Sequence, residues 1–184
     1  MGTRRSKAMS ESRCEKVKQI FPTDTNHHHT LFGGVLMSNI DEISAISAMK
    51  HANSKVVTAS MDSVDFLKPI KTGDIIVFEA KVTHAGTSSM EIGVQIIIED
   101  PLNNERQLAA LSFLTFVAID DDGNTVEVPK VYPESDTEKW FHETAEKRVK
   151  RRKERRKESQ ETVEFLSNQL NIRSVSYTHL TLPT

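Results

Sequence analysis

The residues best suited to chemistry lie close together, between positions 24 and 52. A polar segment containing Asn26 leads to the pair Gly33 and Gly34, and the carboxylate of Asp41 follows in an otherwise apolar run. A carboxylate in a buried helix is costly unless it is paired or used as an acid, a base or a nucleophile. Asp41 is therefore the first candidate catalytic residue, and a cap or a structural ion pair is the alternative.

The two glycines would place an anion-stabilising site on the same element. Adjacent glycines at a helix start let the backbone approach a ligand and leave main-chain N–H groups pointing outward. Such a helix end favours an oxygen that develops negative charge during a reaction. Asp41 follows Gly34 by about 10 Å along the helix axis, so a substrate passing along the helix could meet both. A tight turn packed against a strand is the alternative.

The helix that carries Asp41 is predicted to be buried on most sides, because apolar residues lie all round it: Leu36, Met37, Ile40, Ile43, Ile46, Ala48 and Met49. Strand-like runs surround it at 13–21, 56–67, 75–84, 90–99 and 108–119. In the run 56–67, Val57, Ala59 and Met61 alternate on one face. The sequence therefore predicts an α+β domain in which an antiparallel sheet curls around one helix. The other face of the sheet would remain open, which suggests burial against a partner.

A different kind of sequence begins at position 135. Ser135 and Glu138 form a capping-box pattern, which predicts the start of a long charged helix. Positions 147–157 are almost entirely lysine and arginine, which favours a solvated helix balanced by its own glutamates. Binding to anionic lipid or nucleic acid is the alternative for this basic run.

Four segments are expected along the chain. Residues 1–9 would be a disordered N-terminus, 10–134 the folded domain, and 135–174 a charged helical extension. Residues 175–184 have no relation to the helix before them and resemble a sequencing-library adapter read in frame, so they are excluded from fold reasoning. The true C-terminus is then undefined.

Composition limits the classes of function. The formal net charge of −2 argues against a general nucleic-acid binder. The single cysteine, Cys14, excludes an internal disulfide framework and fits a reducing compartment. No apolar run has transmembrane length and no signal-peptide pattern is present, so a soluble cytoplasmic protein is expected.

Other reactive side chains match no recognised catalytic arrangement. The run His27, His28 and His29 looks like a metal cluster, but consecutive loop residues rarely direct three imidazoles at one ion. Loop packing or contact with a nearby ligand is expected instead, and no metal is predicted. Ser44 and Ser47 lack a Ser-His-Asp setting.

Several motifs occur together in the order that a known family shows. They are Asp24-Thr25-Asn26, Phe32-Gly33-Gly34, Asp41-Glu42, Val57-Thr58-Ala59-Ser60, Ser63-Val64-Asp65-Phe66, Gly73-Asp74, Gly86-Thr87-Ser88-Ser89-Met90-Glu91 and Ala110-Leu111-Ser112-Phe113-Leu114-Thr115-Phe116. With these motifs, residues 10–133 closely resemble the hotdog-fold acyl-CoA thioesterases, and most of all the bacterial and cytosolic acyl-CoA hydrolase group. The combination is far more specific than any single motif in it.

The resemblance implies a six-stranded antiparallel sheet wrapped around the central helix. It also implies that two subunits pair their sheets edge to edge, that dimers form trimers of dimers, and that the active site is shared across the dimer. Asn26 would come from one subunit and Asp41 from the other, with the N–H of Gly34 donating to the thioester carbonyl oxygen. Asn26 would orient water or steady that oxygen. Asp41 would act as a general base or as a nucleophile, and the sequence does not separate these routes.

The same resemblance places the coenzyme A arm of the substrate along Gly33, Asp65, Phe66, Thr87, Ser88 and Ser89. A long acyl chain would need an apolar tunnel between helix and sheet, lined by residues such as Leu36, Ile40 and Met61. Plain core packing is the alternative role for each of these three. No metal or cofactor is expected, because a thioester carbonyl is already electrophilic and coenzyme A belongs to the substrate.

Two other functions are compatible with a hotdog domain. A non-catalytic acyl-CoA sensor could bind nucleic acid through the basic helix, but it would predict a helix-turn-helix, which is not evident, and loss of Asp41, which is retained. A dehydratase would place a histidine near the glycines, where this sequence has Phe32. The thioesterase hypothesis is therefore favoured.

Overall fold

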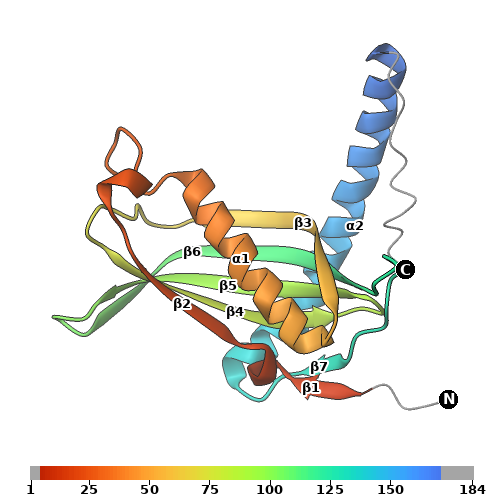
Figure 1. Ribbon diagram of the computed structural model, residues 1–184, viewed down its shortest axis with the longest axis horizontal. Helices are drawn as coiled ribbons and strands as arrows, with labels where there is room; N and C mark the ends of the chain where they lie inside the picture. The colour runs from red at the N-terminus through yellow and green to blue at the C-terminus, as the bar shows by residue number, and fades with distance from the viewer. Residues whose placement is uncertain (1–4, 171–184) are drawn as a thin grey trace.

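The computed structural model describes residues 5–170 of the chain. Residues 175–184, for which a library-adapter origin is expected, lie outside the described residues. Within the described part, two helices lie on opposite faces of one antiparallel sheet (Figure 1).

The sheet has five strands in the order β2-β4-β5-β6-β3, and every neighbouring pair is antiparallel. The strands are β2 (Cys14–Gln19), β3 (Lys55–Phe66), β4 (Ile75–Ala85), β5 (Ser89–Asp100) and β6 (Glu105–Ile119). Helix α1 (Gly33–Ala52) crosses one face of this sheet (Figure 1). The predicted α+β fold, an antiparallel sheet around a central helix, is confirmed.

The core lies between α1 and the sheet. Leu36, Ile40 and Ile43 of the helix are at most 1% exposed, and they pack against inward-facing residues of β4, β5 and β6. Burying each such side chain contributes about 1.5–3 kcal/mol, so this layer supplies most of the driving force that fixes α1 on the sheet. It also fixes the position of Asp41 on that helix.

Several apolar side chains of α1 are not covered by the rest of residues 5–170. Met37, Ile46 and Met49 are 42%, 44% and 43% exposed, so the prediction that this helix is buried on most sides is wrong for the isolated chain. A single sheet touches only one side of a helix, and the remaining apolar side chains stay accessible. Exposed large apolar side chains on a helix are typical of a surface that another molecule covers.

The main sheet has five strands, where the family resemblance implied six. Two further short strands, β1 (Ser6–Ala8) and β7 (Lys130–Tyr132), pair in parallel as a separate sheet. Residues 6–8 are therefore ordered, although disorder was expected at 1–9. Lys7 is 5% exposed, and its Nζ donates to the carbonyl oxygens of Lys50 and His51, each at 2.9 Å. This cation satisfies main-chain carbonyls in the last turn of α1, which ties the N-terminal segment down.

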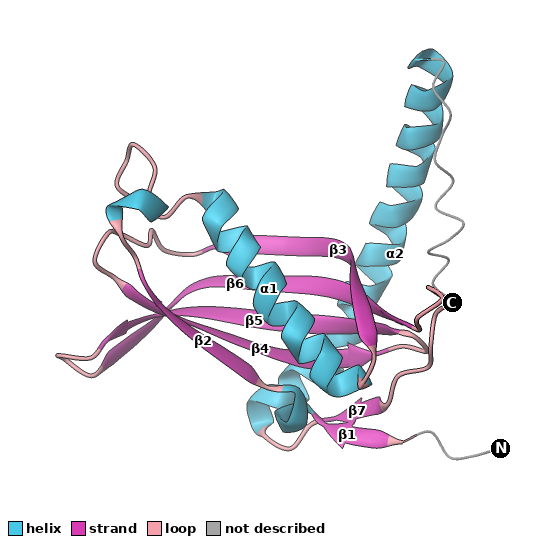
Figure 2. Ribbon diagram, viewed as in Figure 1, coloured by secondary structure: helices cyan, strands magenta, loops and turns pink. Residues whose placement is uncertain are grey.

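Two short 3-10 turns complete the described part of the chain, η1 (Met9–Ser12) and η2 (Pro22–Asp24). The second helix, α2 (Asp136–Leu170), begins where the capping-box pattern predicted. Ser135 N donates to Glu138 Oε2 at 3.2 Å, and Glu138 N donates to Ser135 Oγ at 3.3 Å. The helix then crosses the face of the sheet opposite α1 and continues past β3 (Figure 2).

Side chains of α2 contact several strands in turn. Lys81 of β4 lies 3.5 Å from Glu138, and Phe113 of β6 makes an edge-on contact with Phe141, with 6.1 Å between ring centroids. The sheet face that was expected to remain open is therefore partly covered by this chain's own helix.

The basic run of α2 is also tied to the sheet. Arg148 Nη2 lies 2.9 Å from Oε1 of Glu91, whose side chain is fully buried. Arg152 and Arg155 pair with Asp62 of β3 at 3.1 and 2.6 Å. The prediction that this run is a solvated helix balanced by its own glutamates is wrong for these three arginines, because their partners are carboxylates of the sheet.

Burial of His84 makes the stability of the folded chain sensitive to acid. His84 lies opposite Glu91 in the β4–β5 pairing. Burial lowers the pKa of His84 below its usual 6.5; Glu91 opposes this shift, and Arg152 adds to it. Since the folded state binds this proton less readily than the unfolded state, the contribution of His84 is complete above about pH 6.5 and is lost as the pH falls below it.

We therefore expect the urea midpoint of the wild-type protein to fall more between pH 7 and pH 5.5 than that of His84→Gln. The measurement is urea unfolding of both proteins at the two pH values. Identical shifts for the two proteins would show that another group carries the acid sensitivity.

Candidate active site

Asp41 lies midway along α1 and is partly exposed. Its Oδ1 accepts a hydrogen bond from the hydroxyl of Thr58 on β3 at 2.9 Å. No cation lies within ion-pair distance of Asp41 among residues 5–170, whereas the neighbouring Glu42 pairs with Lys16 at 2.6 Å. The structural ion pair considered for Asp41 is therefore not present among residues 5–170. An oriented carboxylate without a countercharge is suited to act as a base or nucleophile.

Thr58 is a candidate site residue that the sequence did not single out. It stands in one of the family-like motifs, but a threonine in a strand has many ordinary roles. Its hydroxyl fixes one carboxylate oxygen of Asp41, which leaves the other oxygen available to a substrate or a water molecule.

The loop before α1 holds Asn26 by its side-chain oxygen. Oδ1 of Asn26 accepts from the main-chain N–H groups of His28 and Thr30, at 2.9 and 3.3 Å, and from Thr30 Oγ1 at 3.2 Å. The main-chain N–H of Asn26 donates to Thr30 O at 2.9 Å. Within the described part of the chain, no acceptor lies within hydrogen-bond distance of Nδ2. The loop therefore fixes the amide and leaves its N–H donors available for a ligand.

The start of α1 provides a second set of donors. Phe32 is the N-cap and its side chain makes no capping bond, and the first helical bond runs from Leu36 N to Phe32 O at 3.1 Å. The main-chain N–H groups of Gly33 and Gly34 have no hydrogen-bond acceptor among residues 5–170. A Cβ on Gly34 would lie 2.9 Å from a carbon of the Phe32 ring, so a side chain at this position would displace that ring. This helix end can therefore receive an oxyanion.

A single chain does not bring Asn26 into contact with Asp41. The described residues show no hydrogen bond between Asn26, Gly34 and Asp41, and along the axis Asp41 lies about 10 Å beyond Gly34. This separation agrees with a site completed by a second subunit, which stays a prediction.

The expected coenzyme A residues fall in two places. Phe66 ends β3 beside the start of α1, with its Cζ 3.8 Å from the position of a Cβ on Gly33, and Asp65 is its exposed neighbour. Thr87, Ser88 and Ser89 lie in the hairpin turn that connects β4 to β5, which is closed by a hydrogen bond from Gly86 N to Ser89 O at 2.8 Å. Gly33, Asp65 and Phe66 thus lie at the proposed oxyanion site.

The hairpin turn between β4 and β5 is level with the first residues of β3, whereas Phe66 is the last residue of that strand. Ser89 is opposite Val117, which is itself opposite Val57, so the turn lies about 10 Å from β3 at the spacing of neighbouring strands. Thr87 is exposed, whereas Ser88 is 3% exposed and its hydroxyl has no partner among the described residues. Within one chain, Thr87 is the more accessible of these two residues.

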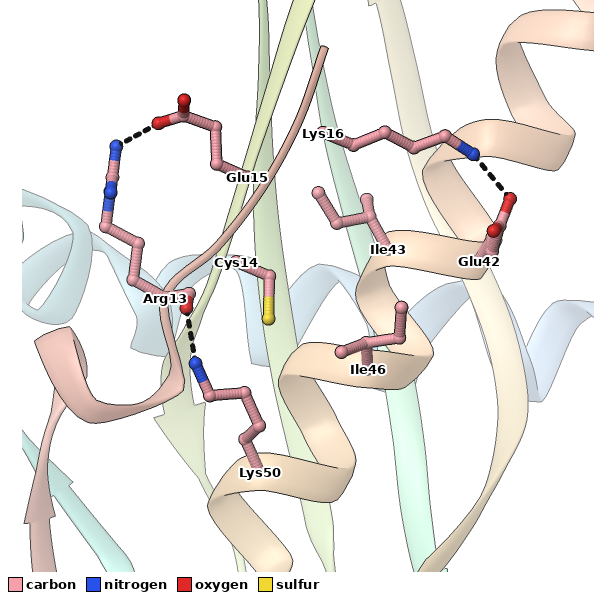
Figure 3. Close-up of a pocket in the computed structure, with 8 residues that line it drawn as sticks. All are labelled: Arg13, Cys14, Glu15, Lys16, Glu42, Ile43, Ile46 and Lys50. Atoms are coloured by element: carbon pink, nitrogen blue, oxygen red, sulfur yellow. Dashed lines mark hydrogen bonds and ion pairs between the residues drawn. The ribbon is translucent and has the colours of Figure 1, made fainter.

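The predicted acyl tunnel is not open within one chain. Leu36 and Ile40 are fully buried in the core, and Met61 packs against it, so core packing describes these residues. A hollow of about 480 Å³ lies instead between β2 and α1, with an apolar floor that includes Ile43 and Ile46 (Figure 3). It contains neither Asp41 nor Asn26.

The three consecutive histidines do not form a metal centre in the described structure. The rings of His27 and His28 contact each other at a tilt of 44°, with 3.8 Å between their centroids, and all three histidines are exposed. Residues 5–170 contain no group of three or more histidine, cysteine or carboxylate side chains that could hold an ion.

Comparison with known proteins agrees with this fold. Residues 28–103 match the model of the thioesterase superfamily. An uncharacterized acyl-CoA thioester hydrolase of Bacillus subtilis is 52% identical over 160 residues, which cover 87% of this chain and 93% of that protein. The chain therefore belongs to the thioesterase superfamily, and the resemblance found in its sequence is confirmed.

Solved structures give a closer comparison. Acyl-CoA hydrolase from Staphylococcus aureus, in complex with butyryl coenzyme A and coenzyme A, is 66% identical, with a TM-score of 0.87, and the match covers 88% of this chain and 99% of that one. A hexameric acyl-CoA thioesterase is 46% identical, with a TM-score of 0.79 and coverage of 82% and 97%. Variants of the S. aureus protein with an aspartate, an asparagine or a threonine replaced by alanine have also been solved. Asp41, Asn26 and Thr58 are the same three residue types.

Thr58 provides a test of the carboxylate's orientation. Replacing Thr58 with valine keeps the shape of the side chain and removes the donor to Asp41. Hydrogen bonds to charged groups contribute about 1.5–3 kcal/mol, so kcat for acyl-CoA hydrolysis is expected to fall by about 10- to 100-fold. Steady-state kinetics of Thr58→Val and the hydroxyl-retaining control Thr58→Ser checks this. Equal kcat values for the two variants would mean that the hydroxyl does not orient Asp41.

Proposed function

We propose that this protein hydrolyses acyl-CoA to a carboxylic acid and coenzyme A. The observation that carries the proposal is the carboxylate of Asp41, held by the Thr58 hydroxyl and not neutralised by any cation in the described structure. The free N–H groups at the start of α1 and the free amide N–H groups of Asn26 supply the donors that such a reaction needs.

The reaction begins with the thioester carbonyl oxygen at the N–H of Gly34. Asp41 removes a proton from a water molecule that attacks the carbonyl carbon, or its own oxygen attacks and forms an anhydride that water then opens. In either route the carbonyl oxygen becomes negative, and the helix start stabilises it. The carbon–sulfur bond breaks as this intermediate collapses, and coenzyme A leaves as the thiolate. Asn26 donates from Nδ2 to the attacking water or to the oxyanion.

No metal or cofactor enters this scheme, since the thioester carbonyl is electrophilic without one. The coenzyme A arm would pass Gly33, Asp65 and Phe66 at the start of α1 and the turn at Thr87–Ser89. The exposed ring of Phe66 offers an apolar surface beside the oxyanion site.

We further propose that the active unit is a homodimer joined through β3. Three such dimers would assemble into a hexamer, a trimer of dimers. Within residues 5–170, strand β3 is at the edge of the sheet and is paired only with β6, so its other side can accept the same strand of a second copy. Such a pairing would also cover the exposed side chains of Met37 and Met49. It would let Asn26 of one subunit meet Asp41 of the other. A hexameric relative supports this assembly.

A cytoplasmic location is proposed from the single cysteine and the cytosolic relatives. No helix within residues 5–170 is long and apolar enough to cross a bilayer. Nucleic-acid binding is disfavoured, because Arg148, Arg152 and Arg155 are occupied by carboxylates of the sheet.

The experiment is steady-state release of free thiol from a panel of acyl-CoAs, from short to long chains. We expect turnover, with the panel defining chain-length preference. Tight binding of acyl-CoA without thiol release would contradict the proposal and favour a non-catalytic acyl-CoA sensor that binds nucleic acid through α2. Binding of labelled duplex DNA with and without acyl-CoA would then test that alternative.

A further inference from the structure

Strand β3 is interrupted by two bulges that decide which way its side chains face. The pairing of β3 with β6 skips Ala59, directly after Thr58, and also skips Asp62. In an unbroken strand, residues 58, 60 and 62 would point to the same side. Here Thr58 bonds to Asp41 on α1, whereas Asp62 bonds to α2 on the opposite face and accepts from Ser60 at 2.6 Å. The bulge at Ala59 therefore lets Thr58 face the catalytic carboxylate while the strand continues toward α2.

Asp62 fixes this irregular segment through a dense set of bonds. Its Oδ2 accepts from Arg152 at 3.1 Å and from Thr115 at 2.8 Å, and its Oδ1 accepts from Arg155 at 2.6 Å. A second guanidinium nitrogen of Arg155 donates to the main-chain oxygen of Asp62. Arg155 thus holds the carboxylate and the backbone of the second bulge residue at once, a geometry that the planar fork of a guanidinium favours.

The helix that carries these arginines is itself anchored. The fully buried carboxylate of Glu91 accepts from Thr83 Oγ1 at 2.7 Å and from Arg148 Nε at 3.0 Å. The Arg148 guanidinium also lies 4.2 Å from the centroid of the Phe113 ring, a cation–π contact. Because α2 is held at this point, Arg152 and Arg155 come from a fixed element.

We infer that Arg152 and Arg155 are positioning residues for thioester hydrolysis, and that they act through Asp62 and the β3 bulges on Thr58 and thus on Asp41. This inference rests on the proposed function and deepens it. These two arginines then hold the catalytic strand in register, and their partner is the chain's own sheet.

The test is Arg155→Gln in the full chain. The Arg155 side chain is 44% exposed, so the substitution removes the bonds to Asp62 without opening the core. A small misplacement of Thr58 and Asp41 is expected to lower kcat by about 10-fold with KM unchanged. Arg155→Lys keeps the charge but not the fork, and is expected to recover part of the loss. Lys153→Gln, on the exposed side of the same helix, is the matched control and is expected to retain wild-type kcat.

A double-mutant cycle with Asp62→Asn identifies the route. If Arg155 acts through Asp62, the double variant should lose no more kcat than the more damaging single variant. The inference is overturned if Arg155→Gln lowers the melting temperature but keeps wild-type kcat, or if the two losses multiply. An inactive wild-type protein would instead overturn the proposed function, and the positioning role with it.

Discussion

Asp41→Asn is expected to lower kcat for acyl-CoA hydrolysis by about 100- to 10,000-fold, the range for loss of a general base. Asparagine has nearly the same shape and can still accept from Thr58, so the fold and KM should change little. An amide is neither a base at neutral pH nor a nucleophile toward a thioester, which removes both routes open to Asp41. The measurement is thiol release under saturating substrate, with the melting temperature as the check on folding.

Glu42→Gln is the matched control for this variant. Glu42 is the next carboxylate on the same helix, but it is exposed and paired with Lys16 at 2.6 Å. Surface ion pairs contribute little, so this variant should retain wild-type kcat. The assignment of Asp41 fails if Asp41→Asn keeps more than about a tenth of wild-type kcat, since such a small loss is below that of a lost general base.

Asn26→Asp is expected to lower kcat by about 100- to 1,000-fold, as for removal of one oxyanion-hole donor. Aspartate keeps the oxygen that accepts from His28 N and Thr30, so the loop should hold its shape. It lacks the N–H donors of Nδ2 and adds a negative charge where an oxyanion must form. Steady-state kinetics and thermal unfolding should therefore show a large loss of activity with little loss of stability.

Asn26→Ala provides the contrast. It removes the same donors and also the three bonds that Oδ1 accepts, so both activity and melting temperature should fall. If Asn26→Asp keeps wild-type kcat while Asn26→Ala does not, the role of Asn26 is to shape the loop, and the donor role is wrong.

The sequence predicted the elements whose signals are local. Strand-like runs, the glycines at a helix start and the capping box at Ser135 depend on neighbouring residues, and each appears in the structure within a few positions. The candidate site residues Asn26, Gly34 and Asp41 were proposed because their types and order match a family. The relatives confirm that the chain belongs to this family and that it is a thioester hydrolase.

What the sequence missed depends on contacts between distant residues. The alternation of Val57, Ala59 and Met61 predicted one strand face, but the bulge at Ala59 breaks it, so Met61 packs on the core with Val56. Nothing local marks a bulge, because its cause is the pairing with β6. Strand β1 was also missed, because it is only three residues long and its partner strand, β7, lies far along the chain.

The arginines of α2 show most clearly that a sequence pattern does not predict contacts between distant residues. A run of like charges indicates a helix face, but it carries no information on which carboxylate of the sheet each arginine meets. Thr58 was overlooked for the same reason, since its role is visible only when Asp41 is placed beside it.

The most direct test of the central claim is to mix the two inactive variants, Asp41→Asn and Asn26→Asp, after unfolding and refolding them together. If Asn26 of one subunit serves Asp41 of the other, each mixed dimer contains one intact site. Random pairing in a twofold-symmetric dimer then restores about a quarter of wild-type kcat per chain. Activity that stays at the level of the separate variants, although mixed dimers have formed, would contradict a site shared between subunits.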